Sequence, residues 1–174
     1  MNAILKSCDV IDAAIRKVCR IILYVTTVVL FLVLSINVFL RYLAGNSLSS
    51  AGEIPELIFP WLVMAGVVLA SQHGAHIAIS WLVDKLSDSM RKVVAILNCG
   101  ILIAAYSLLA WGTYTLMPIV SDERTQVLKV PSSVTYSCML IAFVFLVITS
   151  LTQMARLFIS KAPPPPAMTI TEAA

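Results

Sequence analysis

Charged side chains are scarce in this sequence of 174 residues. Only 12% of the residues are Asp, Glu, Lys or Arg, while 60% are apolar. Soluble domains average about 25% charged and about 45–50% apolar residues. A chain this short cannot cover so much apolar surface with polar groups, which excludes an ordinary soluble enzyme, a nucleic-acid-binding module and a disordered protein. The composition predicts an all-α integral membrane protein, because only helices and closed barrels satisfy their backbone groups in lipid.

Motifs that carry chemistry are also missing. The four cysteines show no C-x-x-C spacing, and the two histidines, His73 and His76, lie in one predicted loop rather than on facing helices. These absences disfavour a membrane disulfide oxidoreductase and a haem protein. No Gly-rich phosphate loop or nucleophile motif is present. We therefore expect no enzyme, and no catalytic, cofactor-binding or metal site in this chain.

Four long apolar stretches are present, over about residues 21–40, 57–72, 93–117 and 130–154. A membrane-spanning helix needs about 20 such residues. The second stretch is short unless its helix begins earlier, near Glu53. None of the four holds an Asp, Glu, Lys, Arg or His, which argues against a self-contained proton-coupled pump or exporter. The most polar residues in the stretches are predicted to hydrogen-bond neighbouring helices rather than a substrate; they are Asn37, Asn98 and Gln153.

Basic residues are distributed unevenly between the predicted loops. Nine of the twelve precede the first span, lie between the second and third, or follow the fourth. The exceptions are Arg41, Arg124 and Lys129. Because cytoplasmic loops carry an excess of Lys and Arg, both termini are predicted to lie in the cytoplasm.

Two segments are predicted to lie flat in the inner membrane interface. Residues 1–20 and 77–92 both show helical periodicity, and Trp81 would anchor the second. In the first, the apolar face comprises Ile4, Leu5, Cys8, Ile11, Ile15, Val18 and Cys19, and the polar face Lys6, Asp9, Arg16, Lys17 and Arg20. The alternative for residues 1–20 is a helix that packs on another subunit. We expect a single membrane domain over 1–161 and a Pro-rich, disordered tail over 162–174.

Small residues recur at helical spacing in two of the spans. Gly66, Ala70 and Gly74 form one such row, and Gly100 and Ala104 form another. Rows of small residues let helix backbones approach closely. The sequence leaves two interpretations open: packing within this chain, or docking on a partner membrane protein.

An ordered set of residues runs from the end of the first span toward the third. Arg41 and Tyr42 come first, and Glu53 follows them. Trp61 lies eight residues after Glu53, Gly66 five residues after Trp61, and His76 ten residues after Gly66. The pattern resembles the small-permease (DctQ-like) subunit of tripartite ATP-independent periplasmic (TRAP) transporters. The motif covers about residues 37–80, and the architecture agrees over the whole chain.

The resemblance implies a scaffold subunit of a sodium-coupled transporter for organic acids in a bacterial inner membrane. It implies two protein partners, a large multi-span permease that holds the sodium and substrate sites, and a periplasmic substrate-binding protein. It places Arg41 and Glu53 at the outer interface, where they could pair with each other, bind a partner or meet lipid headgroups. The alternative function is that of a non-catalytic structural subunit in a different multi-protein membrane complex.

Overall fold

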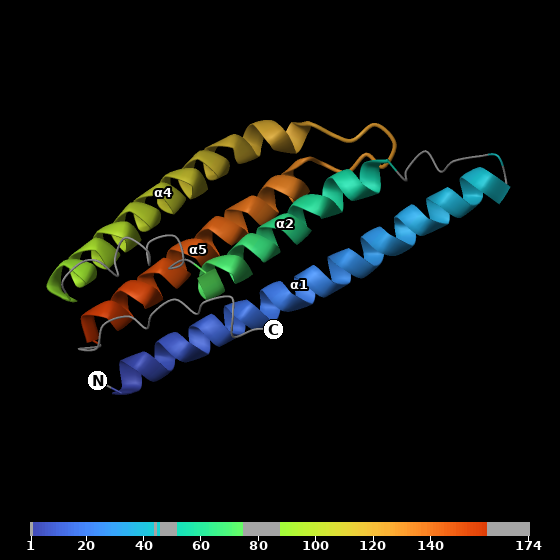
Figure 1. Cartoon of the computed structure of the whole chain (residues 1–174). Helices are drawn as coiled ribbons and strands as arrows, with labels where there is room; N and C mark the ends of the chain where they lie inside the picture. The colour runs from blue at the N-terminus through green and yellow to red at the C-terminus, as the bar shows by residue number, and fades with distance from the viewer. Residues whose placement is uncertain (1, 44, 46–51, 75–87, 160–174) are drawn as a thin grey trace.

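Four α-helices make up most of the computed structural model, which describes residues 2–43, 45, 52–74 and 88–159 (Figure 1). The helices are α1 (Asn2–Leu43), α2 (Glu53–Gly74), α4 (Asp88–Asp122) and α5 (Ser133–Ile159). Each contains a stretch long and apolar enough to cross a membrane. The structure therefore confirms the predicted all-α class with four candidate spans, and α2 does begin at Glu53.

The helices form a layer rather than a closed bundle. α4 packs against α5, α5 against α2, and α2 against α1, with a smaller contact between α1 and α5. Figure 1 shows α4 and α1 at the two edges of this layer, with α5 and α2 between them. A helix inside the layer is covered on two sides, whereas an edge helix is covered on one.

The core is small and is formed by three of the four helices. Its buried residues are Ile15, Cys19, Ala65, Val68, Ala142 and Leu146. Within the most apolar window of each span, 28% of α5 is buried, but none of α1. Most of the apolar surface is thus available to lipid or to another protein, as composition alone would require of a chain with so few charges.

The first helix is continuous from Asn2 to Leu43, so the break predicted near residue 20 is absent. Neither glycine nor proline occurs between these residues, and nothing in the sequence interrupts the backbone hydrogen bonds of the helix. The predicted apolar face is also partly wrong, because Ile11 and Val18 are exposed and Asp12 is buried instead. Residues 2–20 are a packed extension of the first span.

Two other predictions fall on residues that the structure leaves undescribed. Most of the segment 77–92, with Trp81, lies outside the described residues, and its last five residues form the start of α4. The tail 162–174 lies outside them as well.

The helices are offset along their axes. Asp12 of α1 lies beside Gln72 near the end of α2, and the two helices run in opposite directions. At a rise of about 1.5 Å per residue, the start of α2 is level with about residue 31 of α1. The last dozen residues of α1 therefore extend about 18 Å beyond α2, as Figure 1 shows.

Candidate functional site

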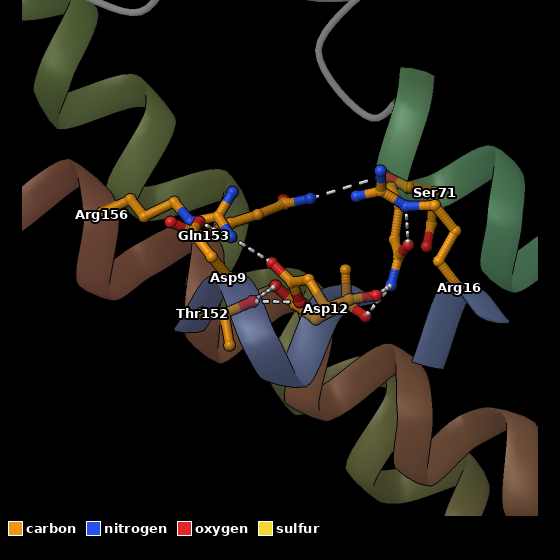
Figure 2. A network of polar contacts seen from close by, with 9 residues as sticks. Asp9, Asp12, Arg16, Ser71, Thr152, Gln153 and Arg156 are labelled. Carbon is orange, nitrogen blue, oxygen red and sulfur yellow. Dashed lines mark hydrogen bonds and ion pairs between the residues drawn. The ribbon is translucent and has the colours of Figure 1, made fainter. Parts of the chain in front are cut away.

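A buried aspartate lies where α1 meets the ends of α2 and α5. Asp12 is only 4% exposed. Its Oδ1 accepts a hydrogen bond of 2.9 Å from the Thr152 hydroxyl, and its Oδ2 pairs with the Arg156 guanidinium (Figure 2). A buried carboxylate is tolerated only when it is paired and hydrogen-bonded, and here both conditions are met.

Arg156 is held by two carboxylates of α1. Besides Asp12 it contacts Oδ1 of Asp9 at 3.0 Å. The Asp9 side chain is 68% exposed, whereas that of Asp12 is 6% exposed. The Asp12 pair therefore operates in a drier environment, and the Asp9 pair is largely screened by solvent. Among the described side chains, the Nε of Arg156 is buried without a hydrogen-bond partner.

The amide of Gln72 joins the same three helices. Its Nε2 donates to the backbone carbonyl of Asp12 at 3.4 Å and to the Thr149 hydroxyl at 3.5 Å. Its Oε1 accepts a 3.3 Å bond from Nε of Arg16. α2 thus contributes one side chain that bonds to both α1 and α5.

A second hydrogen bond from a side-chain amide confirms one prediction from the sequence. Gln153 of α5 donates from Nε2 to the carbonyl of Ser71 in α2 at 3.4 Å (Figure 2). Its role is the predicted one, a hydrogen bond to a neighbouring helix.

These contacts join the charged side chains of Asp9, Asp12 and Arg156 by ion pairs, and they link Arg16 to α2 through the amide of Gln72. Within the described residues no group of three or more His, Cys, Asp or Glu side chains is placed to hold a metal ion. The donors and acceptors of this network are directed at one another. The network therefore holds α1, α2 and α5 together.

Sequence reasoning missed Asp12, although a signal for it exists. Cys8, Asp12, Ile15 and Cys19 follow the 4-3-4 spacing of one helix face, and all four are buried. An acid in such a row requires a base on the facing helix, and Arg156 in the last turn of α5 meets this requirement. The two residues are 144 positions apart, so only the fold brings them together.

At the other end of the layer, Glu53 binds the loop between α4 and α5. Its Oε1 accepts the backbone N–H of Val127 at 2.8 Å, and its Oε2 accepts that of Leu128 at 2.9 Å. Arg41 is exposed in the last turn of α1. Among the described residues, Glu53 is thus engaged by this loop and not by Arg41.

Two further motif residues can be placed in part. Trp61 is half-buried and lines a void of about 20 Å³ between α1, α2 and α5, together with Cys19 and Phe145. His76 lies outside the described residues.

The residues of the two predicted small-residue rows, apart from Gly74, lie outside the buried core of this chain. Ala70, Gly100 and Ala104 are exposed, and Gly66 is half-buried. A Cβ atom added at Gly66 or Gly100 would meet no other atom within 4 Å. Gly74 is the last residue of α2. These positions therefore leave room beside the helices, and their use by a partner remains a hypothesis of the sequence analysis.

Because that space is open, Gly66→Ala and Gly100→Ala are each expected to stabilise the isolated chain by about 0.5–1 kcal/mol. The gain arises because alanine lowers the backbone entropy of the unfolded chain relative to glycine, and the added Cβ atom meets no clash that would offset it. Unfolding of the two variants in detergent, followed by circular dichroism, measures the effect. Destabilisation of either variant would mean that its glycine is in a close helix contact.

Comparison with known proteins identifies the family. Residues 30–159 match the family model "Tripartite ATP-independent periplasmic transporters, DctQ component". The chain is 26% identical over 132 residues to a putative TRAP transporter small permease protein of Haemophilus influenzae, covering 76% of this chain and 80% of the relative. It is 31% identical over 86 residues to the ectoine TRAP transporter small permease protein TeaB of Halomonas elongata, covering 49% and 45% of the two chains.

A longer relative is also similar. The uncharacterized protein y4mM of Sinorhizobium fredii is 35% identical over 125 residues, which are 71% of this chain and 23% of y4mM. The chain thus corresponds to less than a quarter of that protein. The matched region of the family model includes the last third of α1, from residue 30, and all of α2, α4 and α5, whereas Asp12 lies outside it. The chain belongs to the DctQ family, the small permease subunits of TRAP transporters.

Proposed function

We propose that this chain is the scaffold subunit of a sodium-coupled, binding-protein-dependent transporter for organic acids. In this proposal a large permease holds the sodium and substrate sites, a periplasmic binding protein delivers the substrate, and the complex lies in a bacterial inner membrane. The small subunit itself needs no cofactor and catalyses no reaction. It binds the large permease and widens the membrane-embedded body against which that permease moves.

Two observations support the scaffold role. The family match carries the assignment to a TRAP transporter. The structure adds that Asp9 and Asp12 of α1 pair with Arg156 of α5, while the described residues leave much of the apolar surface of the layer uncovered. Such a body is suited to a structural role between lipid and partner. The family match favours this function over that of a subunit in an unrelated membrane complex.

The proposal predicts transport only in the complete assembly. The purified chain alone in proteoliposomes is expected to take up none of a panel of labelled organic acids under a sodium gradient. Uptake should appear when a large TRAP permease and a periplasmic binding protein from the same organism are added, and should fall to background when the small subunit is omitted. Uptake by the small subunit alone would refute the proposal.

The proposed orientation has both termini in the cytoplasm. The start of α1, the end of α2, the start of α4 and the end of α5 lie at one end of the layer (Figure 1), and most basic residues belong to this end. A reporter fused after Lys161 should therefore report the cytoplasm, and one inserted in the loop 123–132 should report the periplasm. The opposite pair of signals would reverse the topology.

A further inference from the structure

The loop between α4 and α5 has a closed, internally bonded shape. The N–H of Thr125 donates to the carbonyl of Val130 at 3.0 Å, and the N–H of Ser132 donates to the carbonyl of Glu123 at 2.9 Å. The Thr125 hydroxyl accepts the N–H of Val130 at 3.1 Å. Lys129 adopts a positive φ of 55°, which lets the chain turn back toward α5.

The turn inside this loop presents consecutive N–H groups on one side. Those of Val127 and Leu128 point at the two carboxylate oxygens of Glu53, at 2.8 and 2.9 Å. Successive amides in a turn form a concave site for an anion, a nest. The short, paired bonds to an ionised acceptor are typical of charge-assisted hydrogen bonding.

We propose that the α4–α5 loop is an anion-binding nest whose resident ligand is the carboxylate of Glu53, and that Glu53 is thereby the residue that positions this loop. The nest needs a carboxylate because, among the residues that the structure describes, the two adjacent N–H donors of the turn find their acceptors on Glu53. Since Glu53 starts α2, the contact ties the loop to a helix that is not next to it in the sequence. It thus fixes the end of the layer opposite to the Asp12 network.

A neighbouring acid supplies a matched control. Glu56 lies in the same first turn of α2 and is exposed. It carries the same charge at nearly the same distance from the helix start, so a general effect of negative charge at a helix N-terminus would involve both residues. Only Glu53 bonds to Val127 and Leu128.

Limited trypsin digestion of the full chain in detergent tests the proposal, because Arg124 and Lys129 are exposed cleavage sites within the loop. Glu53→Ala is expected to accelerate cleavage at these two sites by about tenfold or more, since loss of charge-assisted bonds raises the population of the open loop. Glu56→Ala should cleave at the wild-type rate. Cleavage at Lys17 and Arg20 in α1 reports global unfolding and should not change.

Chemical rescue distinguishes a nest from a mere structural contact. Sodium formate should slow the cleavage of Glu53→Ala toward the wild-type rate, while sodium chloride at equal ionic strength should not. Glu53→Gln keeps the side-chain length and serves if the alanine variant fails to fold; it should give intermediate cleavage and no response to formate, because the amide occupies the site.

The inference fails if Glu53→Ala leaves the cleavage rate unchanged, if Glu56→Ala raises it equally, or if formate gives no protection beyond that of chloride. This experiment uses the small subunit alone. Its outcome is therefore independent of the transport assay, and either proposal can fail without the other.

Discussion

Asp12→Ala is expected to destabilise the chain by about 2–3 kcal/mol, less than the cost of about 3–5 kcal/mol for breaking a fully buried ion pair, because the Arg156 side chain is 39% exposed and keeps Asp9 as a partner. The substitution removes a carboxylate that is 6% exposed and leaves Arg156 with Asp9 as its remaining acidic partner among the described residues. It also leaves the Thr152 hydroxyl without its acceptor on α1. Unfolding by denaturing detergent, followed by circular dichroism, measures the loss.

Asp9→Ala is the matched control, since it removes the same chemical group from the same arginine. Because the Asp9 side chain is 68% exposed, the expected cost is about 0–1 kcal/mol. Equal losses in the two variants would show that the Asp12 pair is as solvated as the Asp9 pair, contrary to the packing of α1 on α5.

The double variant Asp12→Leu with Arg156→Met separates the charge from the packing. Replacing both members of a buried pair by apolar groups of similar size is often close to neutral, because the desolvation of both charges is avoided. We expect it to be more stable than Asp12→Ala alone. A double variant that is clearly less stable than the wild type would indicate that the pair contributes net stability to the chain.

Leu146→Ala carries the second large effect, an expected destabilisation of about 1–3 kcal/mol. Leu146 is 1% exposed and lies in the core formed by α1, α2 and α5. In a water-soluble core the same change costs about 2–5 kcal/mol, part of which is transfer from water. A leucine that moves from lipid into a helix contact gains no free energy of transfer from water. The expected loss for Leu146→Ala is therefore that of the cavity alone.

An exposed leucine on α4 is the control for the loss of core packing in Leu146→Ala. Leu108 of α4 is 72% exposed, and Leu108→Ala should change the stability of the isolated chain by less than about 0.5 kcal/mol. Stability of both variants can be measured in the same detergent titration. A loss for Leu108→Ala comparable to that of Leu146→Ala would mean that α4 is packed on its outer face as well.

Hydropathy was sufficient to predict the four helices, because the alternative in lipid, a closed barrel, is built from strands of about 9–11 residues rather than from apolar stretches of about 20. The start of α2 at Glu53 followed from the length that a span requires. Periodicity was less reliable for residues 2–20. It identified an amphipathic helix, but a helix packed on its own chain and one lying on a membrane show the same alternation of apolar and polar residues.

The polar contacts could not be predicted because they depend on which helices are neighbours. The partner of Glu53 is a pair of backbone N–H groups 74 and 75 positions away. Every residue except proline has such a group, so the residue types at these positions do not reveal the contact. The sequence offered Arg41 as a partner, since opposite charges near one predicted loop are an evident pair. The layer order, in which α2 packs mainly on α1 and α5 and α4 packs mainly on α5, decides these contacts.

The axial offset of α1 makes the subunit sensitive to bilayer thickness. The uncharged stretch of α1, residues 21–40, is centred about ten residues, or about 15 Å, farther along the layer than the middle of α2. Two apolar segments displaced in this way share one bilayer only if the helices tilt, the bilayer thins locally, or Lys17 and Arg20 extend their charged ends toward the headgroups. Each adjustment costs a fraction of a kcal/mol per Å of mismatch, so lipids of different chain length should change the tilt of the whole layer.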